Sequence, residues 1–200
     1  MDADQVAALR ALLSTTGWLE RVGIFSRALR TSVKTPGGLL VVGTPAEEPW
    51  HLTAHLDQES RLSGITELTP TLVRWSPPPG APAHLSVGLS RLEEARRGET
   101  LFVVAPDAAP APLLERVNDA RHVGATIMAL DSDDQELDSL AHESLAVPAD
   151  DELVSRLVNF DSAQHLVSAA AGTREATRSG SRGMRARLAR FLDVVSGPNS

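Results

Sequence analysis

Between Gly98 and Pro148 three short apolar runs alternate with helical patterns, and no other feature constrains the fold of this chain as strongly. The runs are rich in aliphatic residues, as strands buried on both faces are; they are Thr100–Ala105, Ala125–Leu130 and Leu145–Pro148. Helical patterns from Leu113 to Val123 and from Gln135 to His142 separate them. Strands joined by such segments form βαβ crossovers, so the sequence predicts a parallel sheet.

The preceding part of the chain extends the same alternation. Two further strands are predicted, Leu39–Gly43 after the turn TPGG and Thr71–Trp75. Helical patterns complete the series; they run from Pro49 to about Leu62, over His84–Arg96 and over Asp151–Ala171. The predicted fold is therefore α/β: a three-layer α-β-α sandwich around a five-stranded parallel sheet, with flavodoxin-like or Rossmann-like topology.

Both ends of the chain differ from this central alternation. Helical spacing over Asp2–Leu13 and Trp18–Leu29 predicts an N-terminal helical segment, residues 1–35, before the α/β domain, residues 36–172. Residues 173–200 begin as a linker rich in Ser, Thr, Gly and Arg. They end in an amphipathic helix whose apolar stripe is Met184, Leu188, Phe191, Leu192 and Val195.

Composition narrows the classes of function. The 200 residues carry a net charge of −7, which argues against a general affinity for nucleic acid or anionic membranes. The absence of cysteine excludes disulfides, thiolate catalysis and Cys-ligated metals. The acidic N-terminus does not read as a signal peptide, and no apolar window is long enough to span a membrane. We expect a cytoplasmic protein.

Topology alone indicates where a ligand would bind. In doubly wound sheets the binding crevice lies beyond the carboxyl ends of the strands, where the strand order reverses. The candidate site is therefore built from the loops that follow Gly43, Trp75, Ala105 and Leu130.

The segments GETLFVVAP, ARHVGATIMALDS and LAHESLAV, within Gly98–Val147, resemble the sugar isomerase (SIS) domain family of phosphosugar-binding proteins. The elements from about Leu39 to Ala171 are similar to the whole domain. The resemblance implies a five-stranded three-layer sandwich, a homodimer with N-terminal helices at the dimer contact, and a sugar phosphate or another small anion as ligand. We expect no cofactor and no metal.

The family's phosphate loops are altered in this chain. The turn after the first strand, Gly-rich and Ser-containing in the family, reads Gly43-Thr44-Pro45 here, and the loop after the third strand lacks the hydroxyls of Ser-x-Ser-Gly-x-Thr. Asp107 adds a negative charge there, and Pro106 and Pro110 lack N–H donors. The candidate ligand-binding residues at these loops and at the second strand are Gly43, Thr44, Arg74, Ser76, Asp107 and Ala108.

This chain also keeps only some of the catalytic groups of the family's isomerases. The closing helix resembles Gln-Glu-x-His-x-x-x-x-His, and SAQHLVSAA keeps His165 without the second histidine. His51 is the other candidate catalytic residue. It lies four residues before His55, a spacing that can bind zinc, although no third ligand stands at a fixed offset and a solvent-facing or ligand-facing surface fits better.

Two other groups have plainer structural interpretations. Arg74 can bind a phosphate, but an arginine at a strand edge more often pairs with a local carboxylate. Asp131, Asp133 and Asp134 can hold magnesium, but acidic turn residues more often cap the next helix.

The favoured function is a non-catalytic or weakly ligand-binding SIS-like domain, a carbohydrate-derivative-binding, regulatory or assembly module. The alternative is a divergent aldose–ketose phosphosugar isomerase. A third hypothesis, association with nucleic acid, draws on six C-terminal arginines. No interleaved aromatic residues support base stacking, and an amphipathic helix that docks onto its own dimer or another protein fits better. Those arginines are Arg174, Arg178, Arg182, Arg185, Arg187 and Arg190.

Overall fold

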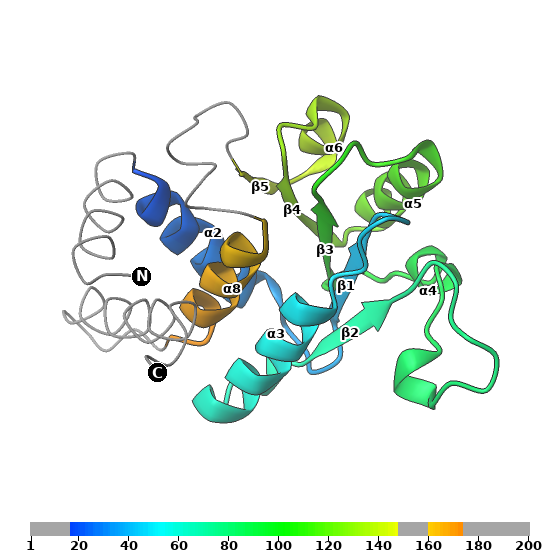
Figure 1. Cartoon of the computed structure of the whole chain (residues 1–200), viewed down its shortest axis with the longest axis horizontal. Coiled ribbons are helices and arrows are strands. Elements are labelled where there is room, and N and C mark those ends of the chain that lie inside the picture. The colour runs from blue at the N-terminus through cyan, green and yellow to red at the C-terminus, as the bar shows by residue number, and fades with distance from the viewer. Residues whose placement is uncertain (1–16, 148–159, 174–200) are drawn as a thin grey trace, which may run out of the picture.

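A computed structural model describes residues 17–147 and 160–173, and these residues form a five-stranded, all-parallel sheet with helices on both faces (Figure 1). The strand order is β2-β1-β3-β4-β5. The predicted fold class and the flavodoxin-like order are confirmed. The strands are β1 (Leu39–Gly43), β2 (Pro70–Val73), β3 (Thr100–Ala105), β4 (Thr126–Asp131) and β5 (Glu143–Ala146).

Each face of the sheet is covered by its own set of helices. One layer contains α2 (Trp18–Ser32), α3 (Trp50–Ser63) and α8 (Phe160–Ala171). The other contains α4 (Ser90–Glu93), α5 (Ala111–His122) and α6 (Gln135–Leu140). The short 3-10 turns are η1 (Thr66–Leu68) and η2 (Ala83–Leu85).

The continuous apolar runs of the sequence follow from this two-sided covering. In β1, Leu39 and Val41 pack on the α2/α3/α8 side, whereas Leu40 and Val42 pack on the other side. Every residue of β3 is buried. Burying one such side chain stabilises the fold by about 1.5–3 kcal/mol, so the two-sided core favours this strand pattern over an alternating one.

The predicted helix over His84–Arg96 is wrong. The backbone N–H of Arg74 donates to the carbonyl of Val87 at 2.8 Å, and Arg74 forms an isolated parallel bridge with Gly88. This pairing keeps Val87 and Gly88 beside β2 and splits the segment into η2 and the four-residue α4. The apolar stripe that suggested a helix instead contributes the buried Leu92 to the core.

Other boundaries moved by a few residues. The strand predicted at Leu145–Pro148 begins two residues earlier, at Glu143, and the helix predicted to reach His142 ends at Leu140. Only the part from Phe160 of the predicted closing helix lies within the described residues. The predicted helix Asp2–Leu13 and the basic segment 174–200 lie outside them. None of the described helices is long and apolar enough to cross a bilayer.

Candidate functional site

The candidate site lies at the sheet edge where the carboxyl ends of the strands meet. Because β1 stands between β2 and β3 in the order β2-β1-β3-β4-β5, the connections after β1 and β3 leave toward opposite faces. Ligands of such sheets bind at this reversal. The loops 44–49 after β1 and 106–110 after β3 therefore decide what can bind.

The loop after β1 folds tightly over the end of its own strand. A Cβ at Gly43 would lie 2.0 Å from the carbonyl oxygen of Glu47, so no larger residue fits there. The indole N–H of Trp75 donates to the Gly43 carbonyl at 2.8 Å. Thr44 is 2% exposed, and its hydroxyl has no hydrogen-bond partner among the described residues. Gly43 and Thr44 are thus packed inside the loop.

Arg74 binds a carboxylate of the protein. Its Nε and Nη2 both lie 2.9 Å from Oε2 of Glu48, and its guanidinium carbon lies 4.5 Å from the centre of the Trp50 ring. The two charged side chains are 14% and 17% exposed, so this ion pair is largely shielded from water. Arg74 therefore fixes loop 44–49 against β2, while the neighbouring Ser76 is exposed.

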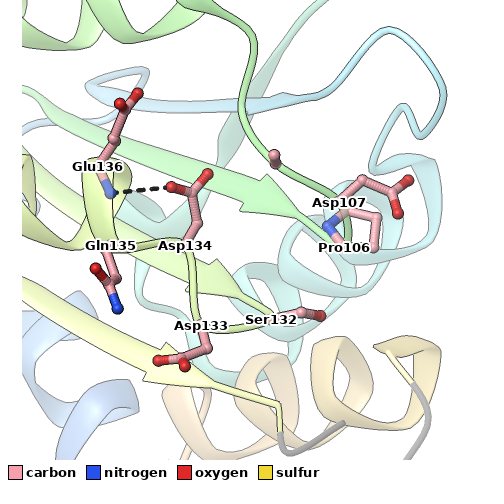
Figure 2. Close-up of a pocket in the computed structure, with 8 residues that line it drawn as sticks. Pro106, Asp107, Ser132, Asp133, Asp134, Gln135 and Glu136 are labelled. Carbon is pink, nitrogen blue, oxygen red and sulfur yellow. Dashed lines mark hydrogen bonds between the residues drawn. The ribbon is translucent and has the colours of Figure 1, made fainter.

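The loop after β3 borders the cavity drawn in Figure 2. The cavity has a volume of about 330 Å³, within the range of small-ligand sites. Asp107 and Ala108 are exposed at this loop. Figure 2 places Pro106 and Asp107 on one side of the cavity and the residues that follow β4 on the other; those are Ser132, Asp133, Asp134, Gln135 and Glu136.

One backbone N–H of this loop is already hydrogen-bonded to a carboxylate of the protein. Oδ2 of Asp134 accepts the N–H of Ala109 at 2.7 Å. Oδ1 of the same side chain accepts the N–H groups of Glu136 and Leu137 at 3.1 Å each, which makes Asp134 the N-cap of α6. This agrees with the sequence-based expectation that the acidic turn caps a helix. Asp134 thus joins the β3 loop to α6.

The cavity is strongly acidic. Four of its eight lining residues carry carboxylates, namely Asp107, Asp133, Asp134 and Glu136. A phosphate dianion placed among them would meet like charges at close range, which costs several kcal/mol at partial burial. Uncharged or positively charged ligands meet no such repulsion.

The two candidate catalytic histidines are not brought together. His165, on α8, contacts His55 on α3, while His51 is exposed one turn earlier. Burial, together with the charge of His55, lowers the pKa of His165 to about 4. The pair is therefore uncharged at neutral pH. Among residues 17–147 and 160–173, no group of three or more His, Cys, Asp or Glu side chains could hold a metal ion.

Sequence reasoning missed the partners that organise the site. The expected carboxylate partner of Arg74 is Glu48, 26 positions earlier in the chain, and the sequence did not identify it. His55 was paired with His51, whereas its contact comes from a residue 110 positions away. Local spacing finds contacts within a helix, but contacts between helices depend on how the sheet orders them. Asp134, directly before the helical pattern that begins at Gln135, was the available signal for the α6 cap.

The chain was compared with known proteins in three ways. No protein-family model matches it, and neither does any curated protein. A candidate phosphosugar isomerase from Silicibacter pomeroyi superposes with a TM-score of 0.53 at 14% identity, over 94% of this chain and 52% of that one. A candidate sugar-binding protein from Salmonella typhimurium gives a TM-score of 0.57 at 13% identity, with the same coverages of 94% and 52%.

The fold of this chain is SIS-like. The chain spans about half the length of each of these two proteins. The Vibrio vulnificus NanR protein complexed with ManNAc-6P also matches, at 10% identity over 94% of this chain and 72% of that one. Its TM-score of 0.43 is too low to carry an argument. The TM-scores of 0.53 and 0.57 show the likeness of fold, and the identities of 13–14% leave the ligand to be argued from the site.

Proposed function

We propose that this chain is a non-catalytic SIS-like module that binds a non-phosphorylated carbohydrate derivative, uncharged or cationic, at the acidic cavity beyond β3 and β4. The hydrogen bond from the Ala109 N–H to Asp134 carries the proposal. A phosphate held at this loop would need backbone donors, and the donor of Ala109 already serves an internal carboxylate. Pro106 and Pro110 have no N–H to offer.

The electrostatics of the cavity support the same ligand class. Asp107 and Glu136 are exposed on opposite sides of a cavity of monosaccharide scale, at about 330 Å³. Carboxylates accept hydrogen bonds from sugar hydroxyls, and they bind an ammonium group more strongly. A hexosamine therefore fits the cavity better than a hexose, and a hexose better than a hexose phosphate.

We assign the module a regulatory or assembly role, because the two histidines predicted as catalytic lie away from its cavity. Proton transfer between sugar carbons needs a positioned base close to its operating pH. The histidines of the chain that could serve, His51 and His165, lie on α3 and α8, whereas the cavity is lined by residues after β3 and β4. Ligand binding would then change the stability or the contacts of the module.

Thermal unfolding with glucosamine, glucose, glucose 6-phosphate and inorganic phosphate tests the proposal. We expect glucosamine to stabilise the protein more than glucose does, and neither phosphate compound to have an effect. A ligand at a hundred times its Kd stabilises by about 2.7 kcal/mol, which is easily measured. Asp107→Asn should reduce the preference for glucosamine. Asp161→Asn, on an exposed site of α8 in the opposite layer, is the matched control and should leave it unchanged.

Two results would contradict the proposal. Stabilisation by glucose 6-phosphate or phosphate, enhanced in Asp107→Asn, would show that the cavity holds an anion after all. A folded protein that none of the sugars stabilises would remove carbohydrate binding.

A further inference from the structure

The edge strand β5 is joined to the sheet by a histidine ring as well as by its backbone (Figure 1). The N–H of His142, the residue before β5, donates to the carbonyl of Ile127 in β4 at 2.8 Å. The imidazole of His142 bonds to the same residue, because its Nδ1 accepts the Ile127 N–H at 2.9 Å. Both backbone polar groups of Ile127 are therefore bonded to His142.

The ring nitrogen takes the place of a strand carbonyl. In a parallel ladder the Ile127 N–H would bond to a carbonyl two residues before His142. That position is Leu140, the last residue of α6, and β5 begins only at Glu143. Ile127 is 0% exposed, and a buried N–H without an acceptor is costly. Nδ1 of His142 therefore stabilises the junction between α6, β5 and β4.

This hydrogen bond exists in only one charge state of His142. A neutral imidazole has one N–H and one acceptor nitrogen, so the bond from Ile127 fixes the ring hydrogen on Nε2. A protonated imidazole carries hydrogen on both nitrogens, and Nδ1 then points an N–H at another N–H. His142 is exposed, so its ring can take up a proton from the solvent. Histidine ordinarily changes its charge between about pH 5 and 8.

The charged groups around His142 do not pair with its ring. Leu145 packs on the α2 side of the sheet, and side chains alternate along a strand, so His142 lies on the side covered by α5 and α6. There Arg121 of α5 donates to the carbonyl of Ser139 at 2.7 Å. The acids of the adjoining elements are Glu143 in β5, Asp131 in β4, and Glu136 and Asp138 in α6. Within residues 17–147 and 160–173, none of these groups forms an ion pair with the imidazole.

We propose that His142 is an acid-sensitive link, which holds β5 and the end of α6 to β4 while its ring is neutral and releases them when the ring is protonated. This goes beyond the proposed function and holds whichever ligand the cavity takes. The bond contributes stability at neutral pH, and this contribution is lost as pH falls, because only the neutral ring accepts the Ile127 N–H.

Release of the link would change two surfaces. In the described sheet β5 has β4 as its one neighbour, so its departure uncovers the backbone N–H and C=O groups along one side of β4. The helix α6 also borders the acidic cavity through Gln135 and Glu136 in its first turn. Acid would therefore loosen one wall of the cavity and expose a strand edge.

Amide hydrogen exchange of the full chain between about pH 7.5 and 5 tests the link at Ile127. After correction for the intrinsic exchange rate, the protection of the Ile127 amide should fall by about tenfold or more as the ring is protonated. The Thr126 amide donates to the carbonyl of Glu99, on the β3 side, at 2.8 Å. It is the internal control, and its protection should change less than that of Ile127.

The local comparison separates the link from other titrations in the fold. Burial raises the pKa of Asp131 to about 6, against the opposing backbone N–H groups of Asp134 and Asp133. The folded state holds this proton more tightly than the unfolded chain, so the contribution of Asp131 to stability is lost as pH rises. That effect has the opposite sign, and it acts on the whole fold, so the ratio of protection at Ile127 and Thr126 removes it.

Two substitutions of His142 have opposite expected results. His142→Asn keeps an acceptor oxygen close to the position of Nδ1 and does not titrate, so the protection of Ile127 should no longer depend on pH. His142→Leu has no acceptor, and its Ile127 amide should exchange at pH 7.5 as the wild-type amide does at pH 5. His122→Asn is the matched control, because Nδ1 of His122 lies 2.8 Å from the carbonyl of Asn118 and protonation preserves that contact. This variant should keep the wild-type pH dependence.

A measurement on wild type does not depend on any variant folding. Nitrogen NMR at pH 7.5 should show a scalar coupling between the Ile127 amide nitrogen and Nδ1 of His142, with the ring hydrogen on Nε2. The coupling should vanish by about pH 5.

Three outcomes would overturn the proposal. The first is a ring hydrogen on Nδ1 of His142 at pH 7.5. The second is a ratio of Ile127 to Thr126 protection that is the same at pH 7.5 and pH 5 in wild type. The third is a His142→Asn variant that keeps the wild-type pH dependence at Ile127.

Discussion

Nδ1 of His165 lies 3.1 Å from Nε2 of His55, and the two rings meet edge to face with centroids 4.4 Å apart. The contact joins α8 to α3 on one face of the sheet. Such a bond needs one nitrogen with a hydrogen and one without, so at least one of the two rings must be neutral. Burial also lowers the pKa of His55, and the charge of His51 lowers it further, against an opposing effect of Glu59.

The histidine pair makes the fold sensitive to acid. The pKa of His165 is about 4 in the folded chain against 6.5 as a reference, so the unfolded chain binds protons more readily between these values. Stability from the pair is therefore full above pH 6.5 and is lost as pH falls through 4. Wild type should lose about 1–2 kcal/mol more unfolding free energy than His165→Gln between pH 7 and 4.5. This figure is discounted because solvent screens a partly buried pair.

Urea unfolding of wild type and His165→Gln across that pH range checks the prediction. The titration of Asp131 acts in the opposite sense over an overlapping range. The difference between the two proteins cancels it, since both contain that acid. His84→Gln, at an exposed position in η2, is the control. A pH dependence that His165→Gln leaves unchanged would exclude the pair as its source.

The sequence was sufficient for the sheet because both faces of each central strand are covered. A run such as Leu39–Gly43 is apolar throughout, and only a two-sided burial explains it. The prediction of a helix over His84–Arg96 was wrong because a long-range contact, not the local pattern, determines its backbone. Its Leu85, Leu89 and Leu92 have helical spacing, but a long-range bond between Arg74 and Val87 decides its backbone, and no local pattern reveals that partner.

The site was predictable in place but not in detail. The predicted topology pointed to the loops after Gly43, Trp75, Ala105 and Leu130, and those after Ala105 and Leu130 line the cavity. The altered phosphate loop was visible at Asp107. The Asp134–Ala109 contact was not visible, because it depends on how the turn after β4 meets the loop after β3.

Gly43→Ala should be strongly destabilising. The added Cβ would lie 2.0 Å from the carbonyl of Glu47 and 2.7 Å from Cδ of Pro49, and backbone would have to move at the end of a buried strand. We expect a loss of about 3 kcal/mol or more, seen as a lower urea midpoint or a loss of folding. Gly88→Ala is the matched control. Its Cβ would approach nothing closer than Cγ of Pro77 at 3.7 Å, and similar losses for both variants would contradict the prediction.

The Arg74–Glu48 ion pair should show strong coupling. Removing either partner leaves a shielded charge without its counter-charge, so Arg74→Ala and Glu48→Gln should each cost about 2–3 kcal/mol. The double variant should lose less than the sum, with a coupling of at least about 1 kcal/mol. Tryptophan fluorescence adds a second readout, because Arg74→Ala uncovers the ring of Trp50. Additive losses would show that the two side chains act independently.

Asp134 has two tasks, and two substitutions separate them. Asp134→Ala removes both the cap of α6 and the acceptor for the Ala109 N–H, and it should cost about 2–3 kcal/mol. Asparagine also caps helices well, but its NH₂ cannot accept the N–H of Ala109 while its oxygen caps α6. Asp134→Asn should therefore cost about 1–2 kcal/mol and selectively expose the Ala109 amide to hydrogen exchange. If Asp134→Asn leaves that amide protected as in wild type, the carboxylate does not hold the β3 loop, and the donor would be free for a ligand.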